Sequence, residues 1–344
     1  MRCLFLYILA SLLLLTSCNH KELCFHHPHT AKVRINVDWS EFKKETPSGM
    51  TVMIYPQQGG KPIRHLTNTI SHAIVDLEAG LYNSIVFNQS EAEFGPVSFV
   101  DMDDFSTAKV VVNDGTSRWY TCSAEGEYLA KQPEWIATDI YTDALVTDAM
   151  VEAEIEEYMA SMQQRSGTRV NFVVAHHTPQ NIIHTINVKV HFSGIYNLLS
   201  ARASLTGLAE GYTFSTTETT EAQVTQLLES WSLTQNPTNP TQGYITSQIT
   251  CMGLPLGHDA EPADNKLTLS VLLVDGKTII DIPFLVGDKF VKRYDESGKF
   301  ILEYDVELWV DEPLPDVQPS DSGGGGFNAT VDDWGDEQNI DLGL

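Results

Sequence analysis

The chain has 344 residues, 42% hydrophobic residues and a formal net charge of −25. This apolar content predicts a folded protein, and the length suits two domains better than a single core. The acidity argues against nucleic-acid binding, which requires clustered Lys and Arg, and against a protein that lies flat on anionic lipid.

The first residues predict a bacterial lipoprotein signal. Arg2 precedes an apolar run at residues 4–15, and two small residues come directly before Cys18. A membrane-spanning helix needs roughly 20 apolar residues, so this run is short for one. Residues 1–17 are therefore expected to be a cleaved signal peptide, and Cys18 is expected to carry acyl chains such as palmitate. The alternative is an ordinary secretory signal in which Cys18 is incidental.

Short strands follow a polar tether at residues 18–30. Apolar and polar residues alternate at 33–39 with the period of two that a half-buried strand shows. Further strands are predicted at 50–55, 70–77, 82–88 and 108–112. Turns rich in Gly, Pro, Asn and Asp separate them. This pattern predicts an antiparallel β-sandwich over residues 31–141.

A helix is predicted to interrupt the strands at residues 142–167. Apolar residues between Met150 and Met162 recur at helical spacing with glutamates between them, and Gly167 is a candidate stop. A helix that binds a partner is one interpretation. We favour a helix that packs against its own sheet or connects two domains, and the domain boundary is predicted here.

Strands return in a second predicted sandwich at residues 168–312. They are expected at 168–175, 182–192, 201–206, 244–252 and 300–310. Asp275-Gly276, between 267–274 and 277–284, predicts a hairpin with a type I′ turn. Residues 214–242 are rich in Thr, Gln and Asn and are expected to form a long loop, with a candidate helical turn at 224–228.

The last segment, residues 313–344, has a different composition. Prolines lead into a glycine-rich linker at 322–326. The apolar residues of the tail are Phe327, Val331, Trp334, Ile340 and Leu342. They are candidates for a strand that is exchanged with another subunit. The alternative is a tail that folds back on its own domain or has no fixed structure.

The cysteines and histidines do not predict a metal or redox site. After removal of the signal peptide, which contains Cys3, the chain keeps Cys24, Cys122 and Cys251 besides Cys18. This odd set favours buried or free thiols and leaves one disulfide open. A histidine cluster near the start has no carboxylate or cysteine set to complete a metal site; its members are His20, His26, His27 and His29. No metal and no cofactor are predicted.

Other candidate chemistry is equally weak. His176, His177 and His184 are expected to be ordinary strand residues. The chain lacks the GxSxG, HExxH, P-loop and GxGxxG motifs, so no enzyme is predicted.

Three stretches carry a resemblance to a known family. They are Cys18 to Cys24 with His26 to Thr30 and the strand ending Val37-Asp38-Trp39, Phe192 to Asn197 with Ala203 to Leu208, and Val331 to Trp334 with Ile340 to Leu342. With the lipoprotein signal, they resemble the fimbrillin-like lipoproteins of Bacteroidales. The nearest group is the fimbrial-anchor or minor-fimbrillin-like proteins, which often carry only the description of a domain of unknown function.

The resemblance implies a mainly β fold: two tandem transthyretin-like antiparallel β-sandwich domains with a short inter-domain or packed helix. It also implies a fimbrial anchor, assembly factor or minor subunit that meets other fimbrial subunits by β-strand addition. Acylated Cys18 would contact lipid of the outer membrane. Lys21-Glu22 resembles a surface-export signal, so surface exposure is expected.

The alternative function is a carbohydrate-binding surface lipoprotein of a nutrient-uptake system, with a host molecule or glycan as ligand. Such sites stack sugars on exposed aromatic rings. The available aromatics are Trp39, Trp119, Tyr120, Trp135, Trp231 and Trp309. Two or three coplanar exposed rings would favour this alternative, and an open groove along one sandwich would favour fimbrial assembly.

Overall fold

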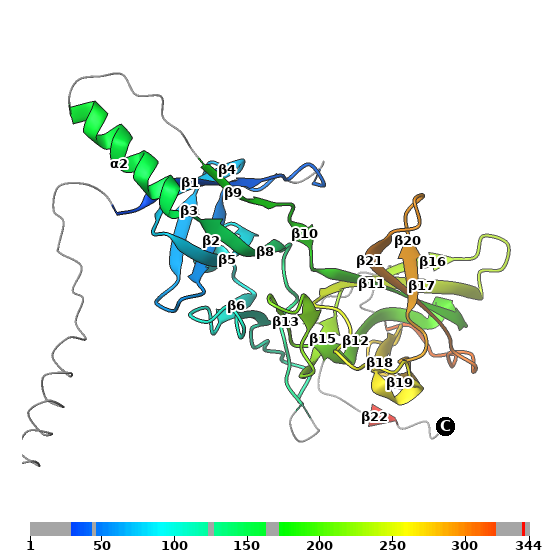
Figure 1. Ribbon diagram of the computed structural model, residues 1–344. Helices are drawn as coiled ribbons and strands as arrows, with labels where there is room; N and C mark the ends of the chain where they lie inside the picture. The colour runs from blue at the N-terminus through cyan, green and yellow to red at the C-terminus, as the bar shows by residue number, and fades with distance from the viewer. Residues whose placement is uncertain (1–28, 43–45, 123–126, 163–171, 321–338, 341–344) are drawn as a thin grey trace, which may run out of the picture. The chain divides into compact units, whose positions relative to one another are not determined.

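The computed structural model describes residues 29–42, 46–122, 127–162, 172–320 and 339–340 (Figure 1). Strands dominate these residues and join into five sheets, most of whose pairs are antiparallel. The predicted mainly β class is confirmed. Within the described part, no helix is long and apolar enough to cross a membrane.

The chain divides into two compact units. The described residues of the smaller unit are 29–33, 75–79, 146–162 and 172, and the larger unit holds the rest. The smaller unit contains the predicted helix, α2 (Asp148–Met162). The Thr147 hydroxyl accepts a hydrogen bond from the Met150 amide at 3.3 Å, which fixes the start of α2. Residues 142–146, expected in the helix, instead end strand β8 (Ala137–Val146).

Two sheets contain the predicted N-terminal strands. In the first, the order is β4 (His72–Leu77), β1 (Ala31–Val37) and β9 (Phe172–His177). In the second, it is β10 (Gln180–Asn181), β8, β5 (Gly80–Asn88), β2 (Met50–Pro56) and β3 (Ile63–Thr67). The strands predicted at 33–39, 50–55, 70–77 and 82–88 are confirmed. The sequence did not predict β3, because its mostly exposed side chains carry no alternation.

A small sheet joins distant parts of the chain. Its order is β14 (Glu218–Thr219), β13 (Gly211–Thr213), β7 (Lys109–Val112) and β6 (Val97–Val100). Phe99 of β6 stacks on Phe87, with 4.5 Å between ring centroids, and on Phe214, with 6.1 Å. The pairing of β13 with β7 brings together segments that the sequence assigned to different domains. The boundary at 142–167 stays a prediction.

Two five-stranded sheets contain the strands of the second half. One has the order β16 (Ser232–Gln235), β17 (Gln242–Cys251), β11 (His184–Ser193), β21 (Phe300–Trp309) and β20 (Val291–Tyr294). The other has the order β15 (Gln223–Leu228), β12 (Leu198–Ala209), β18 (Lys266–Leu273), β19 (Ile279–Leu285) and β22 (Asn339–Ile340). Short 3-10 turns are η2 (Glu91–Glu93), η3 (Ile195–Asn197) and η4 (Pro262–Asp264).

The inner faces of these two sheets share one apolar core. The predicted inward residues of β11 are all buried: Ile186, Val188, Val190 and Phe192. They belong to the same cluster as Leu205 of β12 and Leu269 of β18. This is the packing of a β-sandwich, in which alternate residues of each strand face the core.

Two long strands of the sandwich, β11 and β21, pair in parallel. β11 pairs with β21 from Thr185 opposite Glu303 to His191 opposite Trp309 (Figure 1). Parallel neighbours need a long connection, and here most of the sandwich lies between the two strands in the chain. A period of two shows which face of a strand is buried but not its direction, so the sequence did not predict this pair.

The structure corrects the long loop expected at residues 214–242, because strands lie within this range. Residues 224–228, read as a candidate helical turn, belong to strand β15, which pairs with β12. Thr225 and Gln226 are buried polar residues of this strand, so polarity and burial do not alternate together. The Gln226 side chain donates to the Lys131 carbonyl at 3.0 Å, which satisfies a donor that looked solvent-exposed in the sequence.

The hairpin between β18 and β19 is confirmed, but its turn is not type I′. That turn needs positive φ at both central residues, and only Gly276, with φ of 67°, has it, not Asp275. The carboxylate of Asp275 accepts hydrogen bonds from the backbone amides of Lys277 and Thr278 at 3.0 and 2.9 Å. These bonds stabilise a wider loop, which the dipeptide alone did not distinguish from a tight turn.

Candidate functional site

The chain segment that follows β21 docks against the loop after β11. The Leu314 amide donates to the Ser193 carbonyl at 2.9 Å. Gly194 has a φ of 75°, and a Cβ at this position would lie 2.7 Å from the Leu314 carbonyl oxygen. Glycine is therefore required both by the backbone conformation and by the close approach of the segment.

Asp316 fixes the same segment through side chains. Its carboxylate accepts hydrogen bonds from the Tyr196 hydroxyl and, at 2.9 Å, from the Asn197 side-chain amide. The bond from Tyr196 and then the bond from Asn197 hold the pKa of Asp316 below its ordinary value. The stretch from Phe192 to Asn197, which the sequence singled out, is thus the docking site of the C-terminal segment.

The docked segment leads toward the outer edge of β19. The Ser320 amide donates to the Val274 carbonyl in the β18–β19 loop at 3.1 Å. Further along the chain, β22 pairs in parallel with β19, with Asn339 opposite Ile279 and Ile340 opposite Ile280 (Figure 1). Within the described residues, the tail therefore meets the sheet at this edge.

Most of β19 is an open sheet edge among the described strands. β22 pairs only with residues 279–280 of β19, and the register extends no further among the described strands. Pro283 in the middle of β19 lacks a backbone N–H, as is usual for an edge strand. An edge of this kind can be completed by a strand from the same chain or from another chain.

The predicted tail residues are only partly described. Ile340 lies in β22, while Phe327, Val331, Trp334 and Leu342 fall outside the described residues, as does Cys18. The use of these residues in lipidation and strand exchange remains a prediction.

The described thiols are both free: Cys122 is partly exposed, and Cys251 is buried. Burial raises the pKa of Cys251 to about 12, so its thiol is neutral and unreactive at ordinary pH. Cys24 lies outside the described residues.

The described histidines do not gather around a metal. His29 is described, whereas His20, His26 and His27 are not. The part of the chain that the structure describes contains no group of three or more His, Cys, Asp or Glu side chains placed to hold a metal ion.

A buried serine, a buried histidine and a half-buried aspartate form a hydrogen-bonded chain that the sequence did not indicate. His177 Nε2 lies 2.9 Å from the Ser84 hydroxyl, and His177 Nδ1 lies 3.1 Å from Asp139 Oδ2. These residues come from β9, β5 and β8. With the ring proton on Nδ1, the histidine donates to Asp139 and accepts from Ser84.

This arrangement has the hydrogen-bond connectivity of a catalytic triad, but its serine is not accessible to a substrate. Ser84 and His177 are each 1% exposed, so no substrate reaches the hydroxyl. Burial opposes ionisation of Asp139, but hydrogen bonds from His177 and the Thr178 amide outweigh it and lower the pKa of the carboxyl. The chain of bonds therefore ties three strands together rather than activating a nucleophile.

The comparisons with known proteins agree with this fold. A family model described as "Domain of unknown function (DUF5119)" matches residues 17–229, more than half of the chain. The chain belongs to the DUF5119 family. A relative of this DUF5119 protein in Bacteroides ovatus is named "Putative fimbrium anchoring subunit Fim4B"; the two are 20% identical, with 98% of this chain and 97% of the relative covered.

Solved structures also resemble the DUF5119 chain. A crystal structure titled as a "putative adhesin" from Bacteroides ovatus has a TM-score of 0.52 and 12% identity, covering 87% of this chain and 99% of that one. The fimbrial anchor protein Mfa2 from Porphyromonas gingivalis has a TM-score of 0.44 and 10% identity, covering 81% and 90%. The expected resemblance to the fimbrial-anchor proteins of Bacteroidales is confirmed.

Proposed function

We propose that this protein is a lipid-anchored surface component of fimbriae, in the role of an anchor, assembly factor or minor subunit. The observation that carries the proposal is the relative named as a fimbrium anchoring subunit, which aligns with nearly the whole chain. The edge of β19 supports the assembly part, because it already accepts two residues of the tail as a parallel strand.

The lipid anchor is tested at Cys18. Cells that express the full chain are grown with radiolabelled palmitate, and the protein is recovered from the membrane fraction. Wild type should carry the label, and Cys18→Ala should lose both the label and the membrane association. Cys24→Ala is the matched control, since it removes a nearby thiol outside the signal. Label retained in Cys18→Ala would refute the anchor, whereas its loss in Cys18→Ala alone supports it.

Surface exposure is tested in the same cells. Protease added to intact cells should degrade the wild-type protein if it is displayed on the outer membrane. Full protection in intact cells, with degradation after lysis, would place the protein inside the envelope and contradict surface display.

Strand-mediated assembly is tested with the major fimbrial subunit of the same strain. The full chain and a variant that ends at Ser320 are each mixed with that subunit, and complexes are separated by size. A complex that requires residues 321–344 identifies this protein as a strand donor. A complex that forms without them identifies it as an acceptor or anchor. No complex with either chain overturns the fimbrial proposal.

A further inference from the structure

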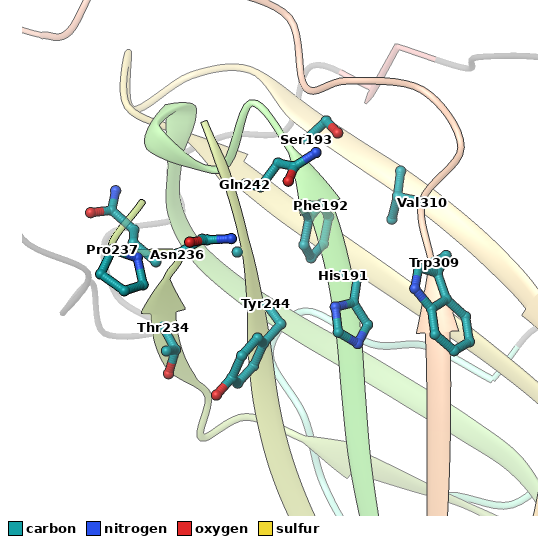
Figure 2. A pocket seen from close by; sticks show the side chains of 12 residues that line it. His191, Phe192, Ser193, Thr234, Asn236, Pro237, Gln242, Tyr244, Trp309 and Val310 are labelled. Carbon is teal, nitrogen blue, oxygen red and sulfur yellow. The ribbon is translucent and has the colours of Figure 1, made fainter. Parts of the chain in front are cut away.

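The outer face of the sheet β16-β17-β11-β21 carries a row of aromatic side chains. In the register of the strands, Tyr244 lies opposite His191, and His191 lies opposite Trp309. Figure 2 shows the three rings side by side on neighbouring strands, and they are called here the aromatic row. Since residues of a strand alternate between faces, the row points away from the buried core that Phe192 and Leu308 enter.

The indole of Trp309 is the accessible member of the aromatic row. It is 60% exposed, and its ring is nearly parallel to that of His191, with centroids 5.1 Å apart and an angle of 5°. β20 begins at Val291 opposite Asp305, so no described strand lies beside Trp309 on the side away from His191. One face of the indole is thus covered by His191, while the side away from it has no neighbouring strand.

The three rings do not lie in one plane, so a flat ligand would stack on the exposed indole of Trp309 alone. The Tyr244 ring is tilted by 55° from His191, with centroids 5.6 Å apart. The row therefore forms the wall of a hollow rather than a flat floor.

Polar side chains complete this hollow of about 590 Å³. Its lining includes Thr234, Asn236 and Gln242 as well as the aromatic row (Figure 2). The Asn236 side-chain oxygen accepts hydrogen bonds from Thr238 and from the Asn239 amide, which hold the carboxamide in place. Apolar surface with a few fixed polar groups, at this volume, is typical of small-ligand sites.

The charged groups on this face are paired with one another. His191 Nε2 donates to Glu307 Oε1 at 2.7 Å, and the Lys189 ammonium lies 3.3 Å from the same oxygen. Arg293 pairs with Glu303 and, at 3.5 Å, with Asp305. A charged ligand would have to displace these pairs, and the net charge of −25 repels anions. The face therefore favours a neutral ligand.

A second hollow continues along the same strands. Its volume is about 680 Å³, and its lining includes Asn187, Thr246 and Gln248. The outward positions from Trp309 back to Asp305 extend over roughly 13 Å at the rise of a β-strand. A ligand that follows both hollows is longer than one ring.

We propose that the aromatic row and the two hollows bind a neutral oligosaccharide. Sugar rings present a C–H face that packs on an indole, and a rim of hydroxyls that both donate and accept hydrogen bonds. The indole of Trp309 supplies the stacking surface, while Asn236 and Gln242 supply amide partners for hydroxyls. The site lies on a sheet face and not at the edge used for strand addition, so it is independent of the proposed fimbrial assembly.

The test is a printed array of neutral, sialylated and sulphated oligosaccharides of defined composition, probed with the purified protein. Wild type should bind neutral oligosaccharides. Trp309→Ala should weaken this binding by about tenfold or more, because truncation of an aromatic side chain that the bound partner covers has costs of this size in interfaces. Trp309→Phe, which keeps a ring, should retain part of the affinity.

Tyr294→Ala is the matched control. Tyr294 is 59% exposed and lies on β20 of the same sheet, outside the aromatic row. This variant should bind like wild type, and circular dichroism should show all variants folded. The proposal is overturned by absence of wild-type binding to neutral oligosaccharides, by binding to charged ones only, or by equal losses in Trp309→Ala and Tyr294→Ala.

Discussion

At the scale of single residues, the molecule uses a buried polar group to link a strand of one sheet to two strands of another. His177 is the clearest case, since both ring nitrogens have partners on other strands at 2.9 and 3.1 Å. Leaving a buried polar group without its partner costs more free energy than the hydrogen bond contributed to stability. The hydrogen-bonded chain of Ser84, His177 and Asp139 is therefore expected to matter for stability and not for chemistry.

His177→Ala should lower the free energy of unfolding by about 2–4 kcal/mol, since it leaves a cavity and removes the hydrogen-bond partner of the Ser84 hydroxyl. Urea denaturation at neutral pH measures this change. His176→Ala is the matched control, because His176 is the adjacent residue on β9 and is exposed. It should change stability by less than about 0.5 kcal/mol. Equal effects of the two substitutions would contradict the structural role of His177.

The lowered pKa of the Asp139 carboxyl predicts that the stability of the fold depends on pH. Its pKa is lower in the folded protein than the value of about 3.9 in an unfolded chain. The stability it contributes is therefore complete above pH ~4 and is lost as the pH falls through the folded pKa. Asp139→Asn lacks this titration. The difference in unfolding free energy between wild type and Asp139→Asn should shrink as the pH falls below about 4. A difference that stays constant below pH 4 would contradict the assignment.

At the scale of elements, the docked segment after β21 depends on one glycine. A Cβ on Gly194 would meet backbone atoms of Leu314, whereas one on Gly298 would meet nothing within 4 Å. Both glycines have positive φ, at 75° and 84°. Both glycines adopt a left-handed backbone conformation, but only Gly194 lies close to Leu314. Comparing substitutions at the two positions therefore separates the cost of the backbone conformation from the cost of the steric contact.

Gly194→Ala should cost about 1–2 kcal/mol more than Gly298→Ala in unfolding free energy. Each substitution carries the left-handed penalty of about 1–2 kcal/mol, and only the first also displaces Leu314. Hydrogen exchange gives a local readout: the Leu314 amide, which donates to Ser193, should lose protection in Gly194→Ala and keep it in Gly298→Ala. Unchanged protection in Gly194→Ala would show that the segment docks without this contact.

The alternation of apolar and polar residues predicted the strands that bury one face. It missed the strands in which polar residues are also buried. In β11, Ile186, Val188 and Val190 face the core while polar residues face outward, so the strand was visible in the sequence. In β15, buried Thr225 and Gln226 hid the strand, because their hydrogen-bond partners come from residues 127–131, far away in the chain. The aromatic row was hidden for the same reason: register, not spacing, brings Tyr244, His191 and Trp309 together.

At the scale of the whole molecule, the parallel pair of β11 with β21 makes the sandwich depend on its last long strand. β21 contributes Tyr304, Val306 and Leu308 to the core and covers the edge of β11. Contacts between segments so distant in the chain form late, because the intervening loop must close first. The sandwich is therefore expected to form only once β21 is in place.

Two truncations test this dependence. A chain that ends at Gly298 lacks β21 and leaves β11 with an open edge and an uncovered core, so it should aggregate or show no cooperative thermal unfolding. A chain that ends at Ser320 keeps β21 and the docked segment and loses only the two paired residues of β22 among the described strands. It should unfold within a few degrees of wild type. Cooperative unfolding of the Gly298 chain at the wild-type temperature would show that β21 is dispensable. A large loss of stability in the Ser320 chain would show that the tail is part of its own fold, and would remove it as a strand available for another subunit.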